Sequence, residues 1–512
     1  MIDLSKRKIL IVLSSLAIVI VSGLSYVLLS TPRFEESINS IDPRDMGVEE
    51  WLKDFEYLYN LVQENYPYLP LKERTHGYNW LDLRAVFEER IRNASDNEDF
   101  LYVIMEAVEA LQNRHTHVLD PGTVIEYHSL YKGLYPMNIV FSDEVAEAAD
   151  YWFEHFERVY ERKYLSRFEV RIVYDRGDYI ITDSQGNPLP RMGVKVTKVD
   201  GVLIDEAVKT CFDREYLDWD FMRNKTYLWR ISPYEFGGDA AFTVLDSIGN
   251  EVDLPLHPSY GPSSISGLYP PSDFIFKKHE EESVGYMYIG TFDPSTVGSH
   301  EDDILDFYGA IENYDYLIID IRGNTGGGFS SWVECIVKPL IKDDVLHEYY
   351  LAYRTGEYIQ WFHDGYLGDK APVSKVVFRY LPPEVQSEDY EIYNFSMTYT
   401  PTQEVDFVGK IVLLTDFMVY SAAEGFTNFC KQTGFATIYG TPSGGDGFFI
   451  WPIYCVLPNS KIAITMTSSM SLDYTGHANE QVRTQPDIYH ETAFMDHDEL
   501  VIFVLDEIRG NS

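Results

Sequence analysis

Three short stretches of the sequence hold residue types that could do chemistry, and the first is rich in glycine. Residues 320–329 read DIRGNTGGGF, with four glycines in the six positions 323–328, directly after the apolar run YLIID. Glycine lets the backbone approach another molecule closely, and the amides of such a loop can face a developing negative charge. No Gly-Lys-Ser/Thr follows, so the loop is not a P-loop. The alternative is a tight turn that only joins a strand to a helix.

The second stretch is FMVYSAAEGF, residues 417–426, in which Ser421 separates an apolar run from an expected helix. At the start of a helix, free N–H groups and the macrodipole stabilise negative charge. Ser421 could therefore be a nucleophile, although a serine hydroxyl needs a neighbouring base before it reacts. It could equally be only a helix N-cap, because Glu424 stands at the capping-box position. The local sequence leaves both readings open.

The third stretch is NRHTHV, residues 113–118, which places His115 and His117 two positions apart. On a strand the two side chains would share a face and could bind a metal, but no third ligand is spaced nearby. A histidine titrates near neutral pH, so either could instead serve as a general base. An ordinary polar surface role is the remaining alternative.

The elements that must position these stretches begin with helices. Apolar residues recur at helical spacing in the first of them, at Trp51, Phe55, Leu58 and Val62. A capping box of Ser95 and Glu98 predicts the start of a second helix, which runs into the histidine stretch. The N-terminal part that carries His115 is therefore expected to be helical.

Short alternating runs follow and predict strands. They are FEVRIVY, DYIIT and GVKVTKVDG, and residues 241–256 predict a hairpin that turns at Gly249-Asn250. Further on, apolar runs at 284–292, 316–320, 410–416, 435–440 and 460–467 alternate with helical patterns. This alternation predicts an α/β layer structure in which all five runs share one sheet.

Taken together, four segments resemble the tail-specific, or C-terminal processing, serine peptidases, including their tricorn-type branch. LIIDIRGNTGGG is similar to the family's Asp-Leu-Arg-x-Asn-x-Gly-Gly signature, and YSAAE resembles its nucleophile segment. LQNRHTHV resembles its Leu-x-Asp-Gly-His-Thr segment, and ANEQVRTQPDI its Glu-Gly-x-Gly-Val-x-Pro-Asp segment. The four occur in the family's order, across roughly residues 50–495.

The resemblance implies an α/β fold with a crotonase/ClpP-like catalytic domain and a small PDZ-like β insert. It implies that Ser421 is the nucleophile and that the N–H groups of Gly326 and Ala422 form the oxyanion hole. The expected division is an N-terminal membrane anchor and linker over 1–35, a helical region over 36–125, a mixed segment with the PDZ-like domain over 126–265, and the catalytic domain over 266–512.

The family's bacterial branch uses a lysine after the serine as its base, and here Asp446 stands at that position in GTPSGGDGFF. Because an aspartate cannot act as a neutral amine, the Ser–Lys dyad is absent. The tricorn-type branch uses a histidine and a late glutamate, which match His115 and Glu480. The resemblance thus implies a Ser421–His115–Glu480 site, with Glu480 holding the imidazole directly or through another group. Gly327, Ser443 and Asp446 are expected to line the substrate cleft.

The net charge limits the possible partners of the protein, and the N-terminal segment indicates its location. The 512 residues include 81 acidic and 41 basic side chains, a net charge of −40, which argues against nucleic acid as a partner. Ile9–Ser30 contains no charged residue and follows the KRK of 6–8, so it predicts a single-pass anchor with the rest of the chain outside the cytoplasm. A cleaved signal peptide is the alternative.

The function expected from these features is a membrane-anchored, extracytoplasmic serine endopeptidase. It would bind unstructured or C-terminal peptide segments and cleave them through an acyl-enzyme, without a metal or an organic cofactor. The four cysteines form no C-x-x-C pair, and buried free thiols are expected. A catalytically inactive ligand- or peptide-binding protein on the same fold is the alternative, and a structural surface protein is a third reading.

Overall fold

The computed structural model of the chain describes residues 42–511 with short gaps. The gaps are 165–166, 169–170, 183–194, 232–235, 237–239, 247, 256–257, 260–268, 368–371, 448–451 and 494–495. The expected anchor, Ile9–Ser30, lies outside the described residues. Within the described part of the chain, every helix is too short or too polar to span a bilayer.

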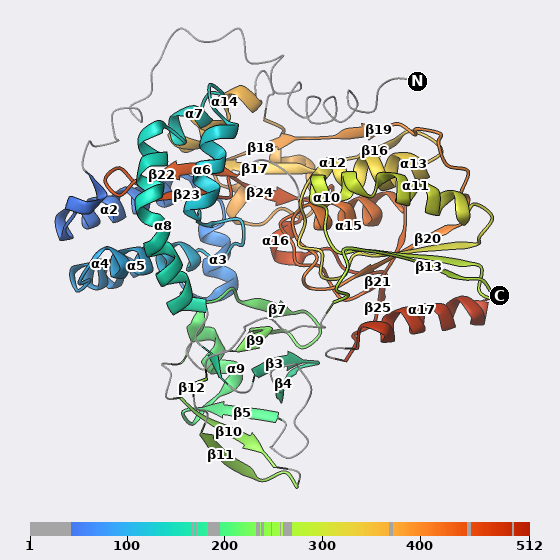
Figure 1. Cartoon of the computed structure of the whole chain (residues 1–512), viewed down its shortest axis with the longest axis horizontal. Coiled ribbons are helices and arrows are strands. Elements are labelled where there is room, and N and C mark those ends of the chain that lie inside the picture. Colours follow the sequence, from blue (N-terminus) through green and yellow to red (C-terminus); the bar gives the residue numbers. More distant parts are fainter. Residues whose placement is uncertain are drawn as a thin grey trace.

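The N-terminal region is helical and lies on the left of Figure 1. Its helices are α2 (Val48–Asn65), α3 (Leu69–His76), α4 (Arg84–Arg92), α5 (Asn97–Glu109), α6 (Pro121–Leu130), α7 (Met137–Val140) and α8 (Asp143–Tyr164). The apolar residues that predicted α2 are all buried, as their spacing requires. α7 and α8 fall within the mixed segment expected over 126–265, so the helices continue to Tyr164.

The capping box predicted for α5 is wrong by one residue. The carboxylate of Asp96 accepts hydrogen bonds from the amides of Glu98 and Asp99, both at 3.0 Å, and so caps the helix. Ser95 instead donates its hydroxyl hydrogen bond to Asp99. An ionised carboxylate is a stronger acceptor for two free amides than a hydroxyl, which accounts for the shift.

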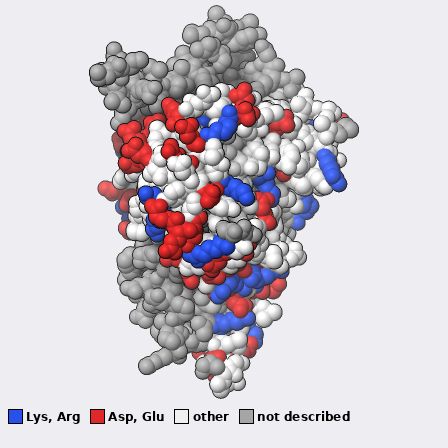
Figure 2. Space-filling model, turned by 90° about the vertical axis from the view of Figure 1, so that its right-hand side faces the viewer, with Lys and Arg blue, Asp and Glu red and all other residues white. Residues whose placement is uncertain are grey.

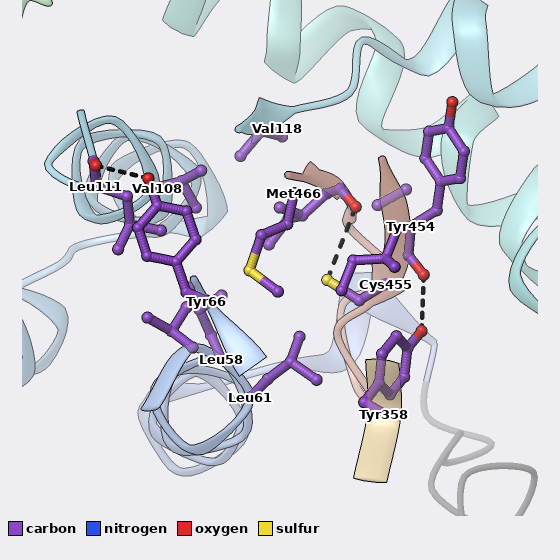
Figure 3. Close-up of a cluster of buried hydrophobic side chains, with 14 of the residues drawn as sticks. Leu58, Leu61, Tyr66, Val108, Leu111, Val118, Tyr358, Tyr454, Cys455 and Met466 are labelled. Atoms are coloured by element: carbon purple, nitrogen blue, oxygen red, sulfur yellow. Dashed lines mark hydrogen bonds between the residues drawn. The ribbon is translucent and has the colours of Figure 1, made fainter. Parts of the chain in front are cut away.

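One hydrophobic core joins this helical region to segments far along the chain. Side chains of α2 and α5 pack against β22 (Ile453–Val456), β23 (Ala463–Met466) and α14 (Glu357–Leu367). Figure 3 shows part of this core, where Tyr66 donates a hydrogen bond to the carbonyl of Leu111 at 2.8 Å and Tyr358 donates one to the carbonyl of Tyr454 at 2.7 Å. Cys455 belongs to it, and none of the four cysteines forms a disulfide. Cys211, Cys430 and Cys455 are buried as expected, whereas Cys335 is only half-buried.

A separate β region lies below the helices in Figure 1. Its main sheet has the order β11-β10-β5-β4-β3-β9. The strands are β3 (Arg171–Asp175), β4 (Asp178–Thr182), β5 (Lys195–Val199), β9 (Arg230–Ile231), β10 (Ala241–Leu245) and β11 (Glu251–Pro255). The predicted hairpin is confirmed, because β10 and β11 pair antiparallel around Gly249, whose φ is +86°.

Smaller elements complete this β region and connect it to the helices. They are β6 (Val202–Leu203), α9 (Ile204–Ala207), β7 (Asp218–Asp220) and β8 (Lys225–Tyr227), with the short pair β2 (Arg167–Phe168) and β12 (Pro258–Ser259). The region has a hydrophobic core of its own, to which Ile172, Val196 and Phe242 belong.

The third part is a six-stranded sheet with helices on both faces. Its strands, in spatial order, are β13 (Phe274–His279), β14 (Val284–Ile289), β15 (Tyr316–Asp320), β20 (Lys410–Thr415), β21 (Thr437–Gly440) and β25 (Ile488–Tyr489). All neighbours from β14 to β25 pair parallel. One face packs on α11 (Glu301–Ala310), α12 (Phe329–Trp332) and α15 (Ala422–Thr433), and the other on α17 (His497–Asn511). Burial on both faces explains why these strands are continuous apolar runs.

The expectation that 460–467 continues this sheet is wrong. β23 pairs instead with β22 and with β1 (His117–Val118) in a separate three-stranded sheet. A fully buried apolar strand is compatible with any core, and this one is buried against the N-terminal helices. The pairing of His117 with Thr465 has a further consequence, since it draws the histidine stretch toward the C-terminal half of the chain.

The remaining elements connect these parts. They are α10 (Pro294–Ser299), α13 (Lys338–Leu340), α16 (Asn479–Val482), β16 (Val345–His347), β17 (Tyr350–Arg354), β18 (Tyr390–Asn394), β19 (Met397–Tyr399) and β24 (Ser469–Leu472). β17 pairs with β18 and β24, and β16 with β19.

Candidate active site

Ser421 stands at the N-cap position of α15, directly after the segment that leaves β20, but its side chain does not cap the helix. Its backbone has φ 56° and ψ −125°, a conformation that non-glycine residues rarely adopt. Such strain directs the side chain away from the helix amides, and the hydroxyl oxygen lies 3.0 Å from Nε2 of His115. The capping alternative is therefore wrong for the side chain of Ser421.

The other ring nitrogen of His115 contacts Asp446. The distance from Nδ1 to Oδ2 is 2.9 Å, so the imidazole bridges a hydroxyl and a carboxylate through its two nitrogens. His115 lies just before β1, and the carbonyl of His115 accepts a hydrogen bond from the hydroxyl of Thr465 on β23 at 3.3 Å. The pairing of β1 with β23 therefore places the histidine beside Ser421, which follows β20 of the six-stranded sheet, called the catalytic sheet below.

Asp446 is only 4% exposed and is surrounded by hydrogen-bond donors. Besides His115, it accepts from the amide of Asn113 at 2.7 Å and from the hydroxyls of Tyr68 at 3.0 Å and Tyr420 at 3.3 Å. Burial by itself would raise the pKa of Asp446, but the bonds and charge from His115, together with those of Asn113 and Tyr68, lower it below its ordinary value. The carboxylate is therefore held ionised next to the imidazole.

The acid that contacts His115 is Asp446 and not Glu480, which corrects the direct form of the sequence expectation. Glu480 forms an ion pair with Lys72 of α3 at 2.6 Å, and both side chains are at most 10% exposed. Burial raises the pKa of Glu480, while the charge of Lys72 opposes that rise. The carboxylate of Glu480, which the family pattern assigned to the histidine, is therefore paired with Lys72. An indirect role of Glu480 stays a prediction.

The glycine loop lies against the serine. A Cβ atom added to Gly326 would lie 2.7 Å from Cβ of Ser421, so no side chain fits there, and the φ of Gly326 is +110°. The N–H of Gly326 donates to Oδ1 of Asn324 at 2.9 Å, whereas Ala422 is the first residue of α15 and has no acceptor within the helix. The exposed Gly327 follows on the same loop.

Ser443 does not line the cleft, because it is fully buried. The amide of Thr484 donates to its hydroxyl oxygen at 2.9 Å, which ties the loop before Asp446 to the segment after α16. Asp446 lies behind His115 and is likewise buried. The cleft predictions for Ser443 and Asp446 are therefore wrong, since their polar groups are used inside the protein.

A cavity of about 330 Å³ opens onto the serine and the histidine. Its lining residues are Arg114, His115, Glu215, Tyr216, Trp229, Thr325, Met418, Tyr420 and Ser421. They come from the helical region, the β region and the catalytic sheet, so the site forms where the three parts meet. His117 is exposed on β1 and is not among them, and the described residues contain no cluster of three potential metal ligands.

Three residues that donate hydrogen bonds to Asp446 escaped the sequence analysis, and one of them, Tyr420, directly precedes Ser421. Tyr68 belongs to the helical region and reaches Asp446 across 378 positions, so no local pattern indicates it. Asn113 belongs to the histidine stretch, and its Oδ1 also accepts the amide N–H of His115 at 3.0 Å. Asp446 stands in the loop that carries the base in the family's bacterial branch. That position was the available signal that Asp446, and not Glu480, contacts His115.

Two parts of the chain match models of known protein families. Residues 283–490 match the model of peptidase family S41, and residues 48–109 match that of the tricorn protease C1 domain. The first match contains the glycine loop, Ser421, Asp446 and Glu480. The second contains most of the helices before His115. No curated protein sequence matches the chain significantly.

Solved structures show a similar fold. Mature CPAF is 13% identical with a TM-score of 0.53, and the alignment covers 90% of this chain and 96% of that one. CPAF complexed with lactacystin is 14% identical with a TM-score of 0.51, and the alignment covers 90% of this chain and 98% of that one. The photosystem II D1 C-terminal processing protease is 14% identical with a TM-score of 0.38, and the alignment covers 86% of this chain and 93% of that one. At these identities the CPAF likeness establishes the mixed α/β fold alone.

Proposed function

The chain belongs to peptidase family S41 and is a serine-type peptidase, and we propose that it is an endopeptidase in which Ser421, His115 and Asp446 act together. The observation that carries this proposal is the imidazole of His115, which lies 3.0 Å from the serine hydroxyl and 2.9 Å from a buried carboxylate. A serine hydroxyl becomes a nucleophile only when a base takes its proton, and the third group must orient that base.

The reaction follows from this geometry. As Oγ of Ser421 attacks the peptide carbonyl carbon, Nε2 of His115 takes the hydroxyl proton, and Asp446 stabilises the imidazolium through Nδ1–H. The imidazolium then donates its proton to the leaving amine, and the acyl group stays on Ser421. Water attacks the acyl-enzyme by the same route, which releases the carboxylic acid and restores the hydroxyl.

The carbonyl oxygen becomes negative during both attacks and needs donors that are already in place. We assign this role to the N–H of Ala422, at the start of α15, and to the glycine loop at Gly326. Support for Gly326 comes from its close approach to Ser421. Its N–H is shared with Asn324 Oδ1, so the oxyanion would compete with that side chain for the hydrogen bond.

The substrate proposed for this site is an unstructured or C-terminal peptide segment, bound as an added strand. The cavity between the β region and the catalytic sheet supports an extended peptide, because Trp229 of the one and Met418 of the other face the same space as Ser421. We retain the PDZ-like assignment of the β region, and the four-part domain division, as proposals.

The location is proposed from the sequence. The uncharged segment Ile9–Ser30 after three basic residues supports a single-pass membrane anchor with an extracytoplasmic catalytic part. The net charge of −40 suits a soluble ectodomain that does not bind nucleic acid. Figure 2 shows groups of acidic side chains on one face, with basic side chains between them.

Labelling with a fluorophosphonate, which reacts covalently with activated serines, tests the proposal. We expect the wild-type chain to be labelled and Ser421→Ala to remain unlabelled. Ser299→Ala is the matched control, since Ser299 is an exposed serine on α10 that does not line the cavity, and it should be labelled like the wild type. A folded wild-type chain that does not react would favour the alternative, a ligand- or peptide-binding protein on the same fold.

A further inference from the structure

The segment that carries His115 is attached to the β region by a set of side-chain contacts that the reaction itself does not use. The side chain of Gln112, 3% exposed, donates to the carbonyls of Phe212 at 2.6 Å and Glu215 at 2.7 Å. Its carbonyl oxygen accepts from the amide of Leu217 at 2.8 Å. A third element of the contact is the hydroxyl of Tyr216, which donates to the carbonyl of Thr116 at 3.3 Å.

The strongest contact of this set is an ion pair beside the histidine. Arg114 donates to both carboxylate oxygens of Asp218 on β7, at 3.2 and 3.0 Å, and the side chain of Asp218 is only 2% exposed. Arg483 donates to the same carboxylate at 3.0 Å. Asp218 thus neutralises two arginines that would otherwise repel each other in a partly buried place.

The two arginines contact the two segments that must keep a fixed distance from each other: the segment of His115 and the loop of Asp446. Arg114 is bonded directly to His115 in the chain. Arg483 packs on the loop that holds Asp446, since an added Cβ on Gly445 would lie 3.4 Å from its Cγ. One carboxylate of the β region therefore connects the residue before the base with a side chain that packs on the loop of the acid.

We propose that Asp218 is a positioning residue for the peptidase reaction: by pairing with Arg114 and Arg483, it holds the imidazole of His115 between Ser421 and Asp446. This inference rests on the proposed function. It makes the β region part of the catalytic apparatus, because Asp218 of β7 pairs with Arg114, the residue directly before the base. A displacement of a catalytic group by about 1 Å can cost about 100-fold in rate.

The test uses the full chain and the kinetics of fluorophosphonate labelling, which separate binding of the probe (KI) from its reaction with the serine (kinact). In Asp218→Asn the shape is kept and the charge is lost, so Arg114 and Arg483 repel each other. We expect kinact to fall by about 10- to 100-fold while KI stays within about threefold. A second variant, Arg114→Met, breaks the same contact from the histidine side and carries the test if Asp218→Asn does not fold.

The control is Asp220→Asn on the same strand. Asp220 is also buried and also pairs with an arginine, Arg223, but neither residue contacts the histidine segment. Its kinact should equal that of the wild type. If Asp218 acts through Arg114, the double variant Asp218→Asn/Arg114→Met loses no more than the worse single variant.

Each outcome decides between the two proposals. A wild type that is labelled, together with folded Asp218→Asn and Arg114→Met variants that react at its rate, overturns the positioning role and leaves the proposed function standing. An equal loss of kinact in Asp220→Asn also overturns it, because the effect would then be general to the β region. A wild type that is not labelled removes the proposed function and this inference together.

Discussion

Nδ1 of His115 lies 2.9 Å from Oδ2 of Asp446, although 331 positions separate the two residues in the chain. Asp446 occupies the position where the bacterial branch of the resembling family carries its catalytic lysine. Here the side chain at that position contacts the imidazole that we propose as the base. Glu480, the acid suggested by the tricorn-type pattern, is paired with Lys72. Of the two carboxylates that the sequence offered for this role, only Asp446 contacts the imidazole.

Replacing Asp446 with asparagine should reduce kcat by about 1,000- to 10,000-fold. The amide cannot stabilise the imidazolium, and its N–H favours the wrong tautomer of His115. Steady-state hydrolysis of an unstructured protein substrate measures the effect. Glu480→Gln is the comparison, and we expect its loss to be at least tenfold smaller. A larger loss in Glu480→Gln than in Asp446→Asn would return the third position to Glu480.

His115→Ala should lose at least about 100-fold in kcat, because the serine hydroxyl then has no base within hydrogen-bond distance. His117→Ala serves as the control, since His117 is exposed on β1 and does not line the active-site cavity. The same hydrolysis assay applies to both variants. Near-wild-type cleavage by His115→Ala would remove the histidine from the mechanism.

Gly326→Ala should abolish most activity, with a fall of at least about 100-fold in kcat. The new Cβ would lie 2.7 Å from Cβ of Ser421 and 2.9 Å from the carbonyl oxygen of Tyr420, and the φ of +110° disfavours alanine. Gly309→Ala, on α11, is the control, because an added Cβ there meets nothing within 4 Å. Full activity of Gly326→Ala would show that the glycine loop is only a connection.

Glu424 should make stability depend on pH. Burial raises the pKa of this carboxyl to about 7, above the value of about 4.3 expected for the unfolded chain. Between these values the folded state binds more protons, so the contribution of Glu424 is present below about pH 4.3 and is lost as pH rises to about 7. The free energy of unfolding of the wild type should therefore fall relative to Glu424→Gln over this range, by roughly 3 kcal/mol.

Chemical denaturation at pH 4.5, 6 and 7.5 measures that difference. The bonds that Glu424 accepts from Thr484 and Asn479 can be kept by the amide oxygen of glutamine, so the variant should fold. Lys431→Met on the exposed side of α15 controls for general effects on the helix. A difference between wild type and Glu424→Gln that does not change with pH would mean that the carboxyl is ionised throughout.

Local patterns predicted much of this protein. The periodicity of Trp51, Phe55, Leu58 and Val62 fixed a helix, and the turn at Gly249 fixed a hairpin, because spacing and turn chemistry act within a few residues. The same holds for the glycine loop, whose residue type follows from the positive φ and the close approach at Gly326. Ser421 differs, because its backbone is one that non-glycine residues rarely adopt, and only its place between an apolar run and an expected helix indicated it. The strand of 460–467 was found but assigned to the wrong sheet, since apolar character indicates burial and not the partner strand.

The sequence by itself thus determined which residues can react: a serine at a strand-to-helix turn, a histidine in a polar segment and glycine amides for an anion. Only the tertiary structure decided which acid the histidine contacts. Asp446 and Glu480 are chemically alike, and their roles differ because Lys72, from a helix more than 400 positions before Glu480, neutralises one of them, while Tyr68 and Asn113 direct their donors to the other. Electrostatic pairing between distant segments exists only once the chain has folded.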